Sequence, residues 1–140
     1  MNITLAIIKP DAVERRKMGS ILARLEEEGF RVRGARLTRL NEALAGEFYA
    51  VHRERPFYES LKAFMTSGPV LVLALERDDA VARLRAVIGA TDPAEAEAGT
   101  IRALYAENKE RNAIHASDSE ETAARELSFF FATGELIAVG

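Results

Sequence analysis

The segment N-A-I-H-A-S-D-S, residues 112–119, holds one of only two histidines in the chain, set among an amide, two hydroxyls and a carboxylate. The imidazole of His115 could act as a nucleophile, because it attacks without first losing a proton, provided that a third group holds its tautomer. Glu126, on an expected final helix, could reach back to supply that group. A core histidine with both ring nitrogens hydrogen-bonded explains the same pattern equally well. The residues alone therefore leave two interpretations of His115, a nucleophile or a structural side chain.

Basic residues that could accompany such a nucleophile occur in distant parts of the chain. Lys9 directly follows an apolar strand, at a strand end of the kind where open sheets often bind ligands. Arg85 precedes an irregular stretch, residues 89–111, and Arg102 lies within it, while Thr91 and Asn112 bracket the same stretch. Each cation taken alone fits a solvated surface charge. Together, two arginines and one lysine suit a polyphosphate.

Several classes of site are excluded or unsupported. The chain has no cysteine, so disulfides, thiolate nucleophiles and sulfur-based zinc sites are excluded. His52 is the only other histidine and no third ligand has matching spacing, so a histidine metal site is not supported. The sequence also lacks the glycine-rich phosphate loop, the dinucleotide fingerprint and the zincin motif. Any phosphate chemistry must therefore be built without a glycine-rich cradle.

The composition indicates which class of protein this is. The chain has 140 residues, of which 48% are apolar and 29% charged, as expected for one globular domain spanning residues 1–140. No segment approaches the ~20 apolar residues of a membrane span. The net charge of -3 gives no reason to expect a nucleic-acid partner. We expect a cytoplasmic protein that binds neither a membrane nor nucleic acid.

The elements that must position these side chains follow from apolar spacing, capping residues and turn residues. Continuous apolar runs predict buried strands at 3–8 and 70–75, alternation predicts a strand at 31–40 with a bulge at Gly34, and a short strand is expected at 112–116. Helical spacing predicts a helix over 18–28, a short helix capped by Asn41 and carrying Leu44, Phe48 and Val51, and another over 57–65. A helix capped by Asp78 or Asp79 should end at Gly89, and residues 117–119 should open the last helix through capping boxes at 117/120 or 118/121. This alternation predicts a two-layer sandwich with helices over a small sheet.

Six blocks of sequence, read in order, resemble one family. They are I-I-K-P-D-A at 7–12, F-Y-x-x-H-x-x-R-P-F-Y at 48–58, T-S-G-P-V at 66–70, G-A-T-D-P-A at 89–94, G-T-I-R at 99–102 and R-N-A-I-H-A-S-D-S at 111–119. Together they resemble the nucleoside diphosphate kinases over essentially the whole chain. The resemblance implies an α+β ferredoxin-like fold, a small antiparallel sheet covered by helices. It also implies Mg-dependent transfer of the γ-phosphoryl group of a nucleoside triphosphate, mainly ATP, to nucleoside diphosphates by a ping-pong mechanism.

The resemblance also implies roles for particular residues. His115 would be the nucleophile, attacking through its δ nitrogen and becoming phosphohistidine, while Glu126 fixes the other ring nitrogen. The remaining roles divide by the part of the nucleotide contacted: Lys9 and Tyr49 at the transferring group, Arg85, Thr91 and Arg102 at the other phosphates, Asn112 at the ribose, and Phe57 stacked on the base. Mg would bridge the phosphates with no direct protein ligand, and would reach Asp118 through water.

The resemblance further implies a homo-oligomer, a tetramer or hexamer built from dimers. Three features depart from the family's common pattern: Ala116 and Glu110 stand where glycine is common, and residues 15–17 are unusually basic. These departures motivate a second hypothesis, a nucleotide-binding or phosphohistidine-relay module with little turnover. Release of phosphate from the histidine to a nucleoside diphosphate discriminates between the two.

Overall fold

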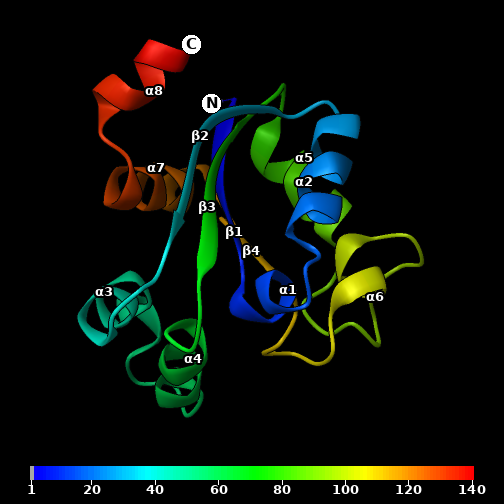
Figure 1. Cartoon of the computed structure of the whole chain (residues 1–140), viewed down its shortest axis with the longest axis vertical. Helices are drawn as coiled ribbons and strands as arrows, with labels where there is room; N and C mark the ends of the chain where they lie inside the picture. Colours follow the sequence, from blue (N-terminus) through cyan, green and yellow to red (C-terminus); the bar gives the residue numbers. More distant parts are fainter. Residues whose placement is uncertain (1) are drawn as a thin grey trace.

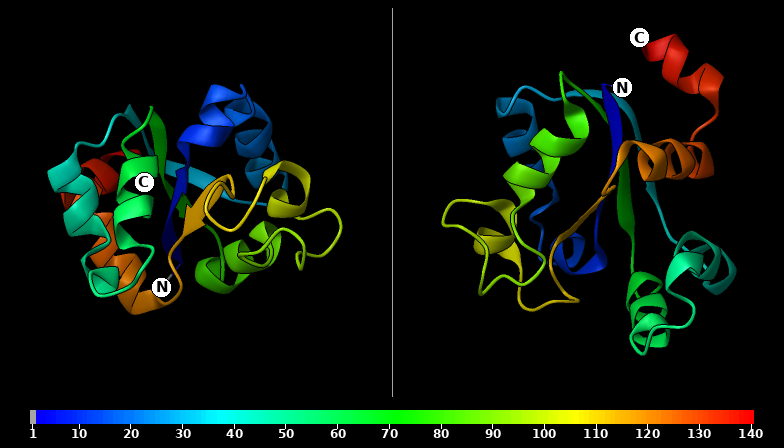
Figure 2. Two further views of the ribbon diagram at one scale, coloured as in Figure 1. Left: turned by 90° about the horizontal axis from the view of Figure 1, so that it is seen from below. Right: turned by 180° about the vertical axis from the view of Figure 1, so that it is seen from behind.

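A computed structural model describes residues 2–140, which form a four-stranded antiparallel sheet with helices on both faces (Figures 1 and 2). The strands are β1 (Ile3–Ile8), β2 (Arg31–Thr38), β3 (Val70–Glu76) and β4 (Ile114–Ala116), in the order β2-β3-β1-β4. The two continuous apolar runs, β1 and β3, lie at the centre of the sheet, where both faces are covered. The shorter or more polar strands, β4 and β2, form its edges.

The helices complete a ferredoxin-like α+β fold, as predicted. In chain order they are α1 (Pro10–Glu14), α2 (Met18–Glu27), α3 (Glu42–Phe48), a 3₁₀ turn η1 (Ala50–His52), α4 (Tyr58–Met65), α5 (Ala80–Ile88), α6 (Ile101–Tyr105), α7 (Glu120–Phe130) and α8 (Thr133–Val139). Strands β1, β2, β3 and β4 with helices α2 and α5 give the order β-α-β-β-α-β of that fold. Within residues 2–140, no helix is both long and apolar enough to cross a bilayer.

Two apolar cores lie on opposite faces of the sheet because successive side chains of a strand point to opposite sides. On one face, Ala6 and Ile8 of β1 pack with residues of α2 and α5. On the other face, Leu5 and Ile7 of β1 pack with residues of α3, α4 and α7. Figure 1 shows α2, α5 and α6 on one side of the strands and α3, α4 and α7 on the other. The second helical layer matters for function, because it covers the face toward which His115 points.

The expected bulge in β2 is present. Val32 pairs with Leu75 and Gly34 with Ala74, so that Arg33 is the additional residue. A side chain at position 34 would not fit, since a Cβ there would lie 2.9 Å from the ring of Phe131. The bulge turns Leu37 to the same face as its partner Leu71, but Leu37 remains 60% exposed because β2 is an edge strand. The predicted face of Leu37 is thus correct, but the prediction that this face is buried at Leu37 is wrong.

Several helix ends differ from the sequence-based expectation. Asn41 caps α3 through its side chain as predicted, but α3 stops at Phe48, and Val51 lies 79% exposed beyond it. Asp79 occupies the N-cap position of α5 without a capping hydrogen bond from its side chain. The capping box of α7 is formed by Ser119 and Thr122, not by the pairs at 117/120 or 118/121. The short helices α1, α6 and α8 were not predicted.

Candidate active site

His115 projects from β4 into the space between the sheet and the second helical layer. Its neighbours in the strand, Ile114 and Ala116, turn toward the first core, so strand alternation sends the imidazole to the opposite face. The ring packs edge-on against Phe48, with centroids 5.3 Å apart, and against Tyr49, with centroids 6.0 Å apart. Its side chain keeps 19% exposure, so the ring is held by packing and is still reachable from solvent. Ala116, a departure from the family pattern, has an ordinary strand conformation.

Glu126 of α7 fixes the protonation pattern of His115. Its Oε1 lies 2.8 Å from His115 Nε2 and accepts a second hydrogen bond, 2.7 Å long, from the hydroxyl of Ser117. Glu126 as a whole is buried, with 8% exposure. Because an ionised carboxylate only accepts hydrogen bonds, the neutral ring carries its proton on Nε2 and a lone pair on Nδ1. An imidazole held in this way by a third group can act as a nucleophile through its free nitrogen.

Lys9 and Asn112 meet beside the sheet end at which β1 stops. Lys9 Nζ donates to Asn112 Oδ1 over 2.8 Å and lies 3.5 Å from the carbonyl oxygen of Glu110. The Asn112 amide nitrogen donates in turn to the carbonyl oxygens of Thr91 and Lys109. Residues from three separate stretches of the chain, at 9, 91 and 109–112, are therefore joined at one place. The structure thus brings Lys9 and Asn112 together with the main-chain carbonyl of Thr91.

The ammonium group of Lys9 is unusually weakly basic. Burial and the positive charge of Arg102 lower its pKa from 10.5 to about 8, while Asp11 and Glu110 oppose that shift. Only 6% of Lys9 is exposed. A buried ammonium without a full counter-charge favours binding of an anion, because an anion restores the electrostatic balance.

Arg102 adds a second cation beneath the histidine strand. Its guanidinium donates to the carbonyl oxygens of Gly89 and Ile114, the residue before His115. Burial and the neighbouring charge of Arg85 lower the pKa of Arg102 to about 10. Arg85 itself is exposed on α5. The two arginines are thus close enough to repel each other, which again favours an anion between them.

The backbone just before His115 is strained. Ala113 has a φ of 74°, and the N–H of Ile114 donates to the carbonyl of Asn112 over 2.9 Å, closing a γ-turn of the rare left-handed kind. The N–H of Ala113 donates to buried Asp11 Oδ2 over 3.1 Å, and its carbonyl accepts from the N–H of Lys9 over 2.9 Å. The segment that follows β1 therefore holds the turn that connects Asn112 to the histidine strand.

Substitutions at position 113 test this strain. We expect Ala113→Gly to leave the free energy of unfolding within about 1 kcal/mol of the parent, because relief of the positive φ offsets the added flexibility of the unfolded chain. Ala113→Val should lower it by about 2–4 kcal/mol, because a β-branched side chain must adopt that φ in a fully buried position. Urea unfolding curves provide the measurement. A valine variant as stable as the parent would contradict the strained turn.

The aromatic residues form a row leading away from His115. The ring of Tyr49 is followed by that of His52, at 6.5 Å, and then by that of Phe57, at 5.3 Å from His52. Phe57 is 45% exposed at the start of α4. The hydroxyl of Tyr49 is buried with no hydrogen-bond partner among residues 2–140, and burial with the nearby charge of Glu126 raises the pKa of Tyr49. The phenol is therefore a hydrogen-bond donor whose proton no residue of 2–140 accepts.

Sequence reasoning missed two residues of this region, Ser117 and His52. Ser117 lies two residues after His115, and strand parity could have placed both on one face. His52 follows Tyr49 by three residues, a spacing that brings side chains together on a helical turn. Its position between Tyr49 and Phe57 makes it part of the same surface, not simply an exposed residue.

The region offers no protein cage for a metal ion. Within the part of the chain that the structure describes, no three histidine, cysteine or acidic side chains are grouped to hold a metal. Asp118 is exposed at the start of α7, and its Oδ1 accepts from the hydroxyl of Thr122 over 2.8 Å. These residues fit a metal carried in by phosphates, with Asp118 available for contact through water.

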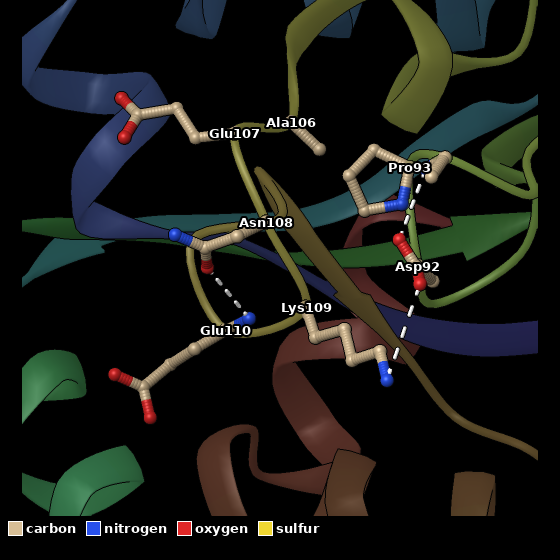
Figure 3. A pocket seen from close by; sticks show the side chains of 8 residues that line it. Asp92, Pro93, Ala106, Glu107, Asn108, Lys109 and Glu110 are labelled. Atoms are coloured by element: carbon tan, nitrogen blue, oxygen red, sulfur yellow. Dashed lines mark hydrogen bonds and ion pairs between the residues drawn. The ribbon is translucent and has the colours of Figure 1, made fainter.

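A separate pocket of about 720 Å³ lies in the connection between α5 and β4 (Figure 3). Its lining comes from residues 92–94 and 106–110, and it includes neither His115 nor Lys9. Two acidic residues, Glu107 and Glu110, and the ion-paired Lys109 and Asp92 line it. The predominance of carboxylates makes it unsuited to a polyphosphate, so the candidate site remains the one around His115.

Comparisons with known proteins identify the family of this chain. Residues 2–136 match the protein family described as nucleoside diphosphate kinase. The chain is 52% identical over 139 residues to the nucleoside diphosphate kinase of Chlorobium limicola, covering 99% of both proteins, and 56% identical over 134 residues to that of Acidiphilium cryptum, covering 96% of both.

Solved structures give the same result. The nucleoside diphosphate kinase of Aquifex aeolicus superposes with a TM-score of 0.94 at 47% identity, over 96% of this chain and 97% of that one. The halophilic enzyme of Halobacterium salinarum, solved in complex with CDP, superposes with a TM-score of 0.92 at 40% identity, over 96% of this chain and 91% of that one. With sequence, fold and family match in agreement over nearly the whole length, this chain belongs to the nucleoside diphosphate kinase family.

Proposed function

We propose that the phosphoryl group passes through Nδ1 of His115. In the first half-reaction the Nδ1 lone pair attacks the γ-phosphorus of a nucleoside triphosphate, the bond from that phosphorus to the β,γ-bridging oxygen breaks, and the electron pair leaves with the nucleoside diphosphate. In the second, a terminal oxygen of the acceptor diphosphate attacks the same phosphorus, the N–P bond breaks, and its electrons return to Nδ1. Glu126 accepts a hydrogen bond from Nε2–H throughout and offsets the positive charge of the phosphorylated ring.

The enzyme is a nucleoside diphosphate kinase, and its remaining polar groups serve the positioning and charge stabilisation on which phosphoryl transfer depends. Lys9 and the hydroxyl of Tyr49 would donate to the transferring group. Arg85, Thr91 and Arg102 would contact the other phosphates. When bound, Mg²⁺ would neutralise charge on the phosphate oxygens that hold it, with Asp118 reaching it through water.

The sugar and base would lie between Asn112 and Phe57. Asn112 would hydrogen-bond the ribose, and the half-exposed ring of Phe57 would stack on the base. Every base has a π-face, so stacking on one phenyl ring discriminates poorly among bases. We therefore expect broad specificity among nucleoside diphosphates.

The observation that carries this proposal is the hydrogen bond from His115 Nε2 to Glu126, which leaves the lone pair on Nδ1. The test is to incubate the protein with γ-labelled ATP and Mg²⁺. The result expected is an acid-labile, alkali-stable phosphoprotein that any nucleoside diphosphate discharges. A phosphoprotein that nucleoside diphosphates do not discharge would favour a relay module, and no labelling at all would refute the proposal.

The pKa of Lys9 predicts an alkaline limit to catalysis. In the enzyme without nucleotide the ammonium is charged below pH 8 and loses its proton as the pH rises through about 8. The ratio kcat/KM reports ionisations of the free enzyme, so it should fall above about pH 8. The corresponding fall in kcat should occur at higher pH, because bound phosphates stabilise the protonated form of Lys9. Profiles measured from pH 6.5 to 9.5 check this. Lys9→Gln should lower kcat/KM at neutral pH by about 10²-fold and remove the fall at high pH, the alkaline limb of the profile. A parent profile that is flat to pH 9.5 would contradict the role of Lys9.

We also infer that residues 1–140 act as one kinase domain in the cytoplasm, and that it works as a tetramer or hexamer built from dimers. The family match over residues 2–136 and the single sheet that carries His115, with Lys9 directly after β1, support one domain. The edge strand β2, with Leu37 60% exposed, is a surface that a second copy could cover.

A further inference from the structure

Side-chain contacts join α4 to residues 107–112, the segment between α6 and β4. The hydroxyl of Ser60 lies 2.8 and 3.1 Å from the two carboxylate oxygens of Glu110 and donates to them. One turn further along α4, the guanidinium carbon of Arg111 lies 5.3 Å from the ring centroid of Phe64. Phe57, Ser60 and Phe64 recur at helical spacing, so they share one face. Residues 107–112 are therefore held against the face of α4 that begins at Phe57.

The same segment is tied inward to the residues proposed to bind phosphate and ribose. The carbonyl oxygen of Glu110 lies 3.5 Å from Lys9 Nζ, and that of Lys109 accepts from the Asn112 amide over 2.9 Å. Figure 3 shows the side chains of Lys109 and Glu110 on opposite sides of the segment, Lys109 extending toward Asp92 and Glu110 pointing away from it. A displacement of Glu110 must therefore also move the partners of Lys9 and Asn112.

We infer that Glu110 is a positioning residue for nucleotide binding, whose carboxylate latches residues 107–112 to Ser60 of α4. This inference rests on the proposed function. The latch, meaning the Ser60–Glu110 hydrogen bonds, fixes the spacing between Phe57, proposed to stack on the base, and the Lys9–Asn112 pair. A nucleotide that spans this distance binds more tightly when both of its contact surfaces are preorganised.

The latch should affect binding far more than chemistry. His115 and Glu126 are held by β4 and α7, whose hydrogen bond does not pass through residues 107–112. Once the nucleotide is bound, the reacting nitrogen therefore has the same surroundings with or without the latch. Breaking the latch should raise KM and leave kcat almost unchanged, which is the signature of lost binding in ground state and transition state alike.

Glu110 also acts on the pKa of Lys9 through its negative charge. This effect does not depend on the hydrogen bond to Ser60. Lys9 faces Arg102 from α6 and Asp11 from α1 as well as Glu110, and the two carboxylates raise its pKa against burial and the arginine. Removing the charge of Glu110 should lower the pKa of Lys9 below about 8. The alkaline limb of kcat/KM should then move to lower pH, whereas loss of the Ser60 hydroxyl should leave it in place.

Four variants separate these effects. Ser60→Ala removes the latch and keeps the charge, Glu110→Ala removes both, and Glu110→Gln removes the charge while keeping an acceptor for Ser60. Glu95→Ala is the matched control, since Glu95 is an exposed acidic residue of the same connection and its backbone N–H, not its side chain, donates to the carbonyl oxygen of Asp92. The measurements are KM and kcat with ADP as acceptor, and the dissociation constant of Mg-ADP by calorimetry, which needs no turnover.

We expect Ser60→Ala and Glu110→Ala each to raise KM and the dissociation constant three- to tenfold, or about 0.7–1.4 kcal/mol, which is the usual worth of a hydrogen bond. Turnover should stay within about twofold, and the double variant should be no weaker than Glu110→Ala, because both changes remove the same contact. Only the two Glu110 variants should shift the alkaline limb. Glu95→Ala should match the parent.

Three outcomes would overturn the inference: an unchanged dissociation constant in both latch variants, additive losses in the double variant, or a fall in kcat with KM unchanged. A general loss of structure would instead lower the unfolding midpoint together with kcat and kcat/KM. That result would also count against a positioning role. If the parent binds Mg-ADP but forms no phosphoprotein, the proposed reaction fails while the latch is still tested by calorimetry. If the parent binds no nucleotide, both fail.

Discussion

Replacing His115 with alanine is expected to lower kcat by roughly 10⁴- to 10⁶-fold, the loss that follows removal of an essential nucleophile. The reason is that the two cations of the site cannot replace the imidazole: Lys9 is largely protonated at neutral pH and the guanidinium of Arg102 has no lone pair to donate. Steady-state phosphoryl transfer from ATP to several nucleoside diphosphates measures this loss.

The control for this variant is its ability to bind nucleotide. The phosphate, ribose and base contacts proposed above do not use the imidazole, so the dissociation constant of Mg-ADP should stay within about threefold of the parent. The ring does pack against Phe48 and Tyr49, so a modest fall in the unfolding midpoint is expected as well. Activity within tenfold of the parent would exclude His115 as the nucleophile.

Glu126→Gln should produce the second-largest loss, about 10²- to 10⁴-fold in kcat with little change in KM. The glutamine amide can donate to Nε2, which would move the ring proton to Nδ1 and hide the lone pair that attacks. It also removes the negative charge that offsets the phosphorylated ring. The rate of phosphoprotein formation in a single turnover, at saturating ATP, isolates this step.

Ser117→Ala is the matched control for Glu126. It removes the other hydrogen bond to the same carboxylate oxygen while keeping the charge and the contact with His115. Its effect should stay below about tenfold, close to the worth of an ordinary hydrogen bond, because the carboxylate keeps its charge and its contact with the ring. Equal losses in Ser117→Ala and Glu126→Gln would indicate that the hydroxyl, and not the carboxylate, orients the ring.

The central strands and most helices were predictable because their signals are local. Continuous apolar runs predicted β1 and β3, and Asn41, whose side chain caps the helix, predicted the start of α3. The capping box of α7 was misplaced because Ser117, Asp118 and Ser119 all suit a cap by type. The tertiary structure decides among them: the Ser117 hydroxyl donates to Glu126 and its N–H to Leu5, which leaves Ser119 to cap the helix.

The parts of the site that sequence could not give depend on contacts between distant residues. The γ-turn at Ala113 contradicts the local preference of alanine, and it is held by Asp11, 102 positions away. The hydrogen bond from Ser60 to Glu110 joins residues 50 positions apart. The sequence pattern proposed Lys9, Asn112 and Glu126 as candidates, and the resemblance implied their roles, but neither predicted that Lys9 donates to Asn112 or that Ser117 donates to Glu126.

The most direct test of the account is to determine which nitrogen carries the phosphate. The protein would be labelled with ¹⁵N on histidine, phosphorylated with ATP and Mg²⁺, and studied by NMR, in which coupling to phosphorus distinguishes the two ring nitrogens. The account predicts phosphorus bonded to Nδ1 of His115, with the proton on Nε2 facing Glu126. Phosphorus on Nε2, on His52 or on a side chain other than histidine would contradict it.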